Sequence, residues 1–273
     1  MPLSKLQIDI LQLLASHRDP ESYVAGSTPL NRDALRYSAD IDVFHDREEL
    51  VGKAAAADAA VLQEHGYTLH WQRREPAIQT VLVESPEAAT RLEWVADSDY
   101  RFFPTMPDEL FGFVLHPADL AMNKALAAAG RRELRDLIDL VTIHDFILPL
   151  GAVVWAAVEK APGYTPEGLL REIRRNSSYS PDDWRALLAT APIDPAATMT
   201  RLRAILREAE AFVSLMPTEK AGLLFLTDGR AVQPDPATLD AYQAHAGCRR
   251  GAWPSSPEIS SAMVERYTKP PLS

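Results

Sequence analysis

Two aspartates that follow a glycine–serine pair form the pattern with the clearest chemistry in this chain. Gly26 and Ser27 end a short β-type run, and twelve residues later Asp40 and Asp42 alternate with apolar residues. Such alternation is typical of a strand and points both carboxylates to the same side. A tight Gly-Ser turn offers backbone N–H groups and a hydroxyl that can hold a phosphate. Two carboxylates beside a phosphate supply the oxygen ligands that Mg²⁺ prefers.

A third carboxylate would complete a site for two metal ions, which activate an attacking hydroxyl and stabilise a leaving pyrophosphate. Glu93 is the best candidate because it lies between apolar residues in the expected strand Arg91–Ala96. The alternative interpretation of Asp40 and Asp42 is a solvated edge strand. The spacing alone is not specific, since Asp97-Ser98-Asp99 repeats it in an expected loop or strand end.

A lysine and an aspartate form a second constellation further along the chain. Lys124 and Asp136 lie on two expected helices, Pro117–Ala129 and Arg132–Leu148, joined by a short connection. Consecutive antiparallel helices bring such groups together at one end of the pair. The alternatives are a lysine that snorkels at the surface and an ordinary ion pair between Asp136 and Arg132, four residues apart.

The elements that must position these residues change in type along the chain. The first half mixes helices and alternating strands, and the second half is mostly helical with a small β-hairpin around Asp228-Gly229. The expected helices are Ser4–Ser16, Glu48–Gly66, Pro117–Ala129, Arg132–Leu148, Pro166–Asn176, Pro181–Thr190 and Pro195–Leu215. The expected strands are Tyr23–Ala25, Asp40–Phe44, Tyr67–Trp71, Ile78–Glu84, Arg91–Ala96, Leu223–Leu226 and Ala231–Gln233.

Two blocks of the sequence resemble a known family. Gly26-Ser27 with the run Arg36–Phe44 is similar to the signature of the polymerase-β-type nucleotidyltransferase superfamily, and within it to the AbiEii-type nucleotidyl transferase toxins. Pro117–Leu126 followed by Arg135–Leu140 resembles that family's Leu-Ala-x-x-Lys and Arg-Asp-x-x-Asp helices. The resemblance covers roughly residues 22–145.

The resemblance implies an α+β fold with a polymerase-β-like nucleotidyltransferase core, a mixed sheet flanked by helices. A helical C-terminal region with a small β-hairpin would follow. The corresponding domains are a nucleotidyltransferase core over residues 1–112, a helical domain that completes the active site over 113–215, and the hairpin with a C-terminal extension over 216–273.

The activity implied by the resemblance is metal-dependent transfer of an NMP from an NTP to an acceptor, with Mg²⁺ or Mn²⁺. Asp136 would act near Lys124 as an orienting or proton-accepting group. The residues implied to bind metal and to serve catalysis are Asp40, Asp42 and Glu93; those implied to bind the nucleotide are Gly26, Ser27, Arg36, Ser38 and Lys124.

The implied partners follow from the same family, whose members include toxins that add nucleotides to tRNA ends. RNA or tRNA is therefore an expected acceptor, and an antitoxin protein an expected partner. Several arginines could contact RNA phosphates or pair with neighbouring carboxylates: Arg171, Arg174 and Arg175 on one helical face, then Arg201, Arg203, Arg207 and Arg249-Arg250. The alternatives are a transferase acting on a small, antibiotic-type molecule and a catalytically idle module that binds a partner protein.

Composition limits the remaining possibilities. The chain of 273 residues has a formal net charge of −10, which argues against coating of DNA or anionic membrane. One cysteine excludes a disulfide framework or a Cys-rich zinc site within the chain. The longest apolar run, Phe146–Val158, contains Pro149 and Gly151 and is shorter than the ~20 residues of a membrane span. No signal-peptide pattern is expected, and a cytoplasmic protein fits these features.

Overall fold

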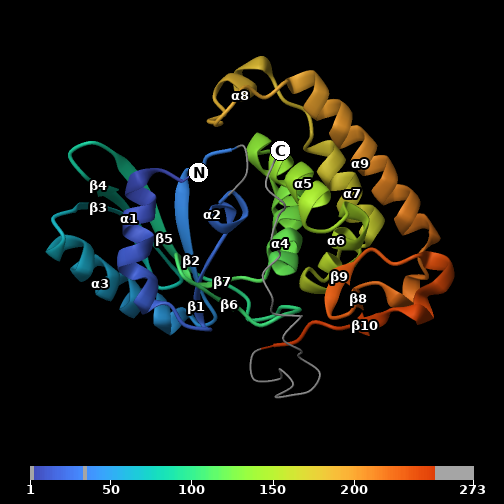
Figure 1. Ribbon diagram of the computed structural model, residues 1–273, viewed down its shortest axis with the longest axis horizontal. Helices are drawn as coiled ribbons and strands as arrows, with labels where there is room; N and C mark the ends of the chain where they lie inside the picture. Colours follow the sequence, from blue (N-terminus) through green and yellow to red (C-terminus); the bar gives the residue numbers. More distant parts are fainter. Residues whose placement is uncertain (1–2, 33–35, 250–273) are drawn as a thin grey trace. The chain divides into compact units, whose positions relative to one another are not determined.

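The structure is a computed structural model that describes residues 3–32 and 36–249. Within these ranges the chain divides into two compact units. Figure 1 colours the chain by residue number, from blue at the N-terminus to red toward the C-terminus. Unit 1 comprises Met1–Asp99 and Pro104–His116, and unit 2 comprises Tyr100–Phe103 and Pro117–Ser273. Unit 2 thus holds both the helices and the small sheet that the sequence suggests as separate parts.

Unit 1 is built on a seven-stranded mixed sheet with the order β3-β4-β5-β2-β1-β7-β6. At its centre β2 pairs antiparallel with β1 and parallel with β5. The strands are β1 (Ser22–Ala25), β2 (Asp40–His45), β3 (Thr68–Glu75), β4 (Ile78–Glu84), β5 (Ala89–Ala96), β6 (Met106–Asp108) and β7 (Gly112–Val114).

Two helices contribute apolar residues to the core on one face of this sheet. Helix α1 (Lys5–Leu14) begins at Ser4, whose hydroxyl forms a capping box with Gln7. Helix α3 (Glu48–Glu64) follows β2. The shared core includes Leu6, Ile10, Leu14, Ile41, Val43, Val51, Ala55, Leu62, Val81, Leu92 and Trp94. Because side chains alternate along a strand, Asp40 and Asp42 occupy the opposite face of β2, as predicted.

A buried polar cluster lies on the helix-covered side of unit 1. The Asp58 carboxylate accepts hydrogen bonds from the Trp94 indole at 2.7 Å and from Arg18, and contacts His17 Nδ1 at 2.7 Å. His45 is fully buried nearby, and neither ring nitrogen has a hydrogen-bond partner among the described residues. Burial and then the charge of Arg18 lower the pKa of His45 to about 4.

Unit 2 consists of helices and a three-stranded sheet with the order β10-β8-β9. Helix α4 packs against α5, α6 and α7, and α9 packs against the same three helices. The helices are α4 (Pro117–Gly130), α5 (Leu134–Phe146), α6 (Leu150–Ala157), α7 (Pro166–Arg175), α8 (Pro181–Arg185) and α9 (Pro195–Leu215). The strands are β8 (Leu224–Thr227), β9 (Arg230–Val232) and β10 (Gln243–His245).

The segment Tyr100–Phe103 is tied into unit 2 by a buried carboxylate. Asp119 accepts the backbone N–H groups of Phe102 and Phe103 at 2.9 and 3.0 Å and pairs with Lys160 at 2.7 Å. The Phe103 ring also stacks on His245 of β10, with centroids 5.0 Å apart. These contacts join an early segment to the small sheet at the end of the described chain.

The predicted α+β class is confirmed, with a mixed sheet flanked by helices and a later helical region. The predicted hairpin turn is also confirmed, because Asp228 and Gly229 have φ values of 50° and 75°, as a two-residue hairpin turn requires. Strand β10 extends this hairpin to three strands. The predicted helix Pro181–Thr190 ends at Arg185 instead. Of the expected extension over 216–273, residues 250–273 lie outside the described part of the chain.

No single helix in the described ranges is long and apolar enough to cross a membrane. One pair, Leu134–Phe146 with Leu150–Lys160, passes that test of length and composition only when joined across a 112° bend.

We predict that replacing His45 makes unit 1 less sensitive to acid. Between pH 6.5 and about 4 the unfolded chain binds a proton on His45 that the folded chain does not. The free energy of unfolding of the wild type should therefore fall as the pH drops through this window, by up to about 3 kcal/mol from this group. Urea unfolding of His45→Leu should show a correspondingly flatter pH profile.

The exposed His65 provides the control for this measurement, since its replacement by Leu should leave the pH profile of the wild type in place. A His45→Leu profile as steep as that of the wild type would show that His45 is protonated equally in the folded and unfolded chain.

Candidate functional site

The turn at Gly26 and the carboxylate of Asp42 are in direct contact. Antiparallel pairing of β1 and β2 places Ala25 opposite Asp42, so the chain turns at Gly26 beside that side chain. Gly26 has φ 69° and ψ −140°, a conformation that residues with a Cβ rarely adopt. A Cβ built on Gly26 would lie 2.1 Å from Asp42 Oδ2. Only a glycine therefore leaves room for the carboxylate against this turn.

The register of the sheet gathers charged groups on the face that carries Asp42. In the parallel β2–β5 pair, Asp40 lies opposite Arg91 and Asp42 opposite Glu93. Arg91 contacts Asp40 Oδ2 at 2.5 Å, and Glu93 Oε2 accepts a hydrogen bond from Thr80 of β4 at 2.8 Å. Asp40, Asp42 and Glu93 are all partly exposed. The sequence suggested Glu93 as a neighbour of the two aspartates, whereas the pairing of Asp40 with Arg91 was not foreseen.

The three carboxylates Asp40, Asp42 and Glu93 offer oxygen donors, which suit a hard divalent cation such as Mg²⁺ or Mn²⁺, although Asp40 is paired with Arg91. In the part of the chain that the structure describes, no three His, Cys, Asp or Glu side chains form a group that could hold a metal. Protein-bound Mg²⁺ is commonly held by one or two carboxylates together with substrate phosphates. Asp40 and Asp42 fit that partial kind of site, and a metal-binding role for Glu93 stays a prediction.

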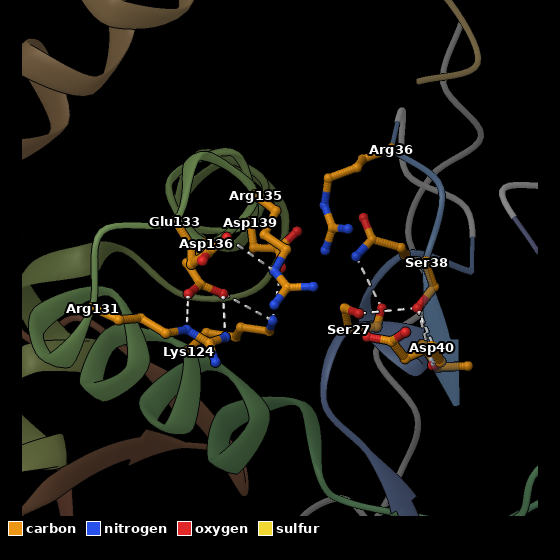
Figure 2. Close-up of polar contacts among 12 residues, drawn as sticks. Ser27, Arg36, Ser38, Asp40, Lys124, Arg131, Glu133, Arg135, Asp136 and Asp139 are labelled. Carbon is orange, nitrogen blue, oxygen red and sulfur yellow. Dashed lines mark hydrogen bonds and ion pairs between the residues drawn. The ribbon is translucent and has the colours of Figure 1, made fainter. Parts of the chain in front are cut away.

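Of the remaining predicted nucleotide-binding residues of unit 1, Ser27 and Ser38 lie beside Asp40, as Figure 2 shows. The Ser27 and Ser38 hydroxyls are 2.9 Å apart, and Ser38 donates to the backbone oxygen of Asp40 at 2.9 Å. Arg36 donates a hydrogen bond to the backbone oxygen of Tyr37 at 2.9 Å. Ser27 begins the short helix α2 (Ser27–Leu30), which is not among the helices expected from the sequence.

In unit 2, Lys124 lies in a cluster of buried charges, also drawn in Figure 2. Its Nζ is 2.9 Å from Asp139 Oδ2 and 3.4 Å from Asp136 Oδ1, and both aspartates are fully buried on α5. Arg131 donates two hydrogen bonds to Asp136, from Nε at 2.6 Å and from a terminal nitrogen at 3.1 Å. The predicted convergence of Lys124 and Asp136 is present within this unit.

Asp136 is held in its charged form. Burial by itself would raise the pKa of this carboxyl, but the hydrogen bonds from Arg131 and the charge of Lys124 outweigh it and lower the pKa. A carboxylate with a lowered pKa is a weak proton acceptor, so the geometry favours an orienting role toward Lys124.

The two alternatives considered for this cluster are wrong. Only 9% of the Lys124 side chain is exposed, so it is not a surface lysine. Arg132 does not pair with Asp136; it donates to Ser178 O at 2.6 Å and to Asp183 at 2.7 Å. Sequence reasoning gave no role to Asp139, although Asp136 and Asp139 are three residues apart and so share a helix face.

The connection between α4 and α5 is held by a later segment of unit 2. Asn176 donates to the backbone oxygens of Ala128 and Ala129 at 3.1 and 2.8 Å, which satisfies carbonyls at the end of α4. The Arg132 guanidinium lies over the Tyr179 ring, 5.0 Å from its centroid. These contacts fix the turn that carries Arg131.

Three of the seven predicted arginines that the structure describes, which include Arg249, form ion pairs with carboxylates. Arg174 pairs with Glu210 and Arg201 with Asp145, each at 2.5 Å, and Arg175 contacts Glu172. Arg171, Arg203 and Arg207 are exposed. Arg250 lies outside the described residues.

Comparisons with known proteins give structural similarity without sequence support. No protein-family model matches the chain, and no curated protein matches it. The nucleotidyltransferase toxin MenT4 from Mycobacterium tuberculosis is 18% identical over 78% of this chain and 83% of its own, with a TM-score of 0.49. JHP933 from Helicobacter pylori is 17% identical over 78% of this chain and 95% of its own, with a TM-score of 0.44. The RNA terminal uridylyl transferase Cid1 is 12% identical over 56% and 48%, with a TM-score of 0.28.

We predict that Gly26→Ala destabilises unit 1 by more than the strain of placing an alanine at a positive φ would cost. The new methyl group must displace the Asp42 carboxylate as well as strain the backbone, and together these should cost at least about 2 kcal/mol. Gly66 is the matched control, because it also has a positive φ but nothing lies within 4 Å of its Cβ position. Equal losses for Gly26→Ala and Gly66→Ala in urea unfolding would contradict the close contact.

We predict that Asp136→Asn destabilises unit 2 by about 3 kcal/mol, because it removes the carboxylate partner of Arg131 and leaves Lys124 with Asp139 alone. Asp145→Asn on the same helix removes an exposed pair with Arg201 and should change stability by less than about 1 kcal/mol. Thermal unfolding of both variants compares them directly. A melting temperature for Asp136→Asn equal to that of Asp145→Asn would contradict the buried cluster.

Proposed function

We propose that this protein is a metal-dependent nucleotidyltransferase that moves an NMP from an NTP to an acceptor. The observation that carries the proposal is the contact between the Asp42 carboxylate and the Gly26 turn, with Asp40 on the same face of β2. Oxygen donors for a cation and a turn suited to a phosphate stand side by side within one unit.

The residues of unit 1 would share the work as follows. Asp40 and Asp42 hold Mg²⁺ or Mn²⁺ together with phosphate oxygens of the nucleotide, and the Gly26–Ser27 turn holds the triphosphate. A cation held there would supply positive charge that offsets the phosphates and makes an attacking hydroxyl more acidic. The acceptor oxygen bonds to the α-phosphorus as its proton passes to solvent water, and pyrophosphate departs with the electrons of the broken P–O bond.

For unit 2, we propose that Lys124 supplies a positive charge to the phosphates. Asp136 and Asp139 surround its ammonium group and restrict its position, which reduces the entropy lost when it binds. An ammonium group has three N–H donors, and these two carboxylates use two of them. One donor is left for a phosphate oxygen.

We propose RNA as the acceptor class, supported by the exposed arginines Arg171, Arg203 and Arg207. A toxin-like activity of this kind implies a partner antitoxin that holds it in check, and a cytoplasmic setting supplies NTP and Mg²⁺.

We predict that Asp42→Asn lowers nucleotidyl transfer at least about 100-fold while the melting temperature changes little. The reason is that one charge for the cation is lost, whereas the side chain keeps its size. Incubation with each labelled NTP, Mg²⁺ and either total RNA or small hydroxyl compounds measures the transfer. Asp97→Asn is the control, since it alters the other Asp-x-Asp of the chain at an exposed position.

Three outcomes of this assay would overturn parts of the proposal. Label on the small hydroxyl compounds and not on RNA would replace the acceptor class. Full activity of Asp42→Asn would remove the proposed metal site. No transfer with any NTP, together with capture of one stoichiometric partner protein, would favour an idle binding module.

A further inference from the structure

Three buried hydroxyl groups meet at the backbone of the first aspartate. Thr28 Oγ1 and Ser38 Oγ both donate to the carbonyl oxygen of Asp40, at 2.7 and 2.9 Å. Ser27 Oγ lies 2.9 Å from Ser38 Oγ. Thr28 is fully buried, and Ser27 and Ser38 are less than a tenth exposed. The network joins the Gly26–Ser27 turn to the start of β2 without using any carboxylate.

The donors in this network are limited. A hydroxyl has one hydrogen to donate, and a carbonyl oxygen accepts two bonds. Ser38 Oγ also lies 3.1 Å from Thr28 Oγ1, and either oxygen can donate in that contact and in the bond between Ser27 and Ser38. Thr28 and Ser38 thus reach the Asp40 carbonyl oxygen directly, and Ser27 is joined to it through Ser38.

A glutamine on α1 holds the same segment from the other side. Gln7 is 3% exposed, and its Nε2 donates to Ser38 O at 3.0 Å and to Thr90 Oγ1 of β5 at 3.3 Å. Its Oε1 accepts from the backbone N–H of Ser4 at 2.9 Å. All the polar atoms of this side chain are thus used, and they link α1, the segment before β2, and β5.

We propose that Thr28 is a positioning residue for nucleotidyl transfer, with Gln7 as its support. The Thr28 hydroxyl fixes the backbone of Asp40, and that backbone sets where the carboxylates of Asp40 and Asp42 lie relative to the Gly26 turn. This inference rests on the proposed function. Thr28 itself touches neither carboxylate in the contacts described, so it acts through Asp40 and is not a catalytic residue.

The test compares Thr28→Val, which removes the hydroxyl at nearly constant volume, with Thr28→Ser, which keeps it. Thr105→Val is the matched control, because Thr105 is also buried in unit 1 and donates to a backbone oxygen, that of Pro20 at 3.1 Å. Calorimetry with Mg²⁺ and NTP measures affinity, transfer assays separate kcat from KM, and hydrogen exchange follows the amides of residues 36–45.

We expect Thr28→Val to bind Mg²⁺–NTP about tenfold more weakly, the effect of losing one well-placed hydrogen bond. It should also lower kcat and speed amide exchange over 36–45. Thr28→Ser and Thr105→Val should match the wild type in affinity and kcat. If Thr28→Val fails to fold, Gln7→Met removes the bond to Ser38 O and should shift the same quantities in the same direction.

Unchanged affinity, kcat and exchange in Thr28→Val would overturn the inference, as would an equal loss in Thr105→Val. A wild type that binds no NTP would contradict the proposed function instead, and the exchange data would still show whether Thr28 holds the strand.

Discussion

The contact between a carboxylate and a glycine turn is the constraint on which unit 1 depends. A negative group can lie against the Gly26 backbone only because that residue has no Cβ and adopts a positive φ. The pairing of β1 with β2 determines which carboxylate this is, since a shift of one residue would bring an apolar side chain to the turn. The contact between Asp42 and the turn therefore requires three features together: the register of β1 and β2, a glycine at position 26, and the alternation of side chains along β2.

The two units hold their charges in different ways. In unit 1 the acidic groups are partly exposed on a sheet face, where Arg91 pairs with Asp40. In unit 2 Lys124 is packed between aspartates that have lost their water, and Arg131 completes the charge balance. Burial thus fixes the Lys124 ammonium group between its partners, whereas the charged groups of unit 1 stay in contact with water.

Much of this could be predicted from the sequence because the signals were local. Alternation in Asp40–Phe44 indicated the strand and the face of its carboxylates, and the apolar spacing around Lys124 indicated its helix. Strands β6 and β7 are three residues each and form only because the sheet offers them partners. Helix α6 is buried on all sides, so it shows no polar face for periodicity to detect.

The parts of the site that could not be predicted depend on residues distant in the sequence. Arg91 meets Asp40 through strand pairing across 51 positions, and Gln7 reaches Ser38 across 31. Arg131 pairs with Asp136, whereas its neighbour Arg132 pairs with Asp183. The segment after α7, which carries Asp183, determines this pairing. Helical spacing alone favoured the wrong arginine, because it contains no information about that segment.

The most direct test of the central claim is anomalous diffraction from crystals grown with Mn²⁺ and a non-hydrolysable NTP analogue. The account predicts a manganese peak bound by the carboxylates of Asp40 and Asp42, with the triphosphate on the Gly26–Ser27 turn. A manganese peak elsewhere, or a triphosphate bound away from that turn, would contradict it.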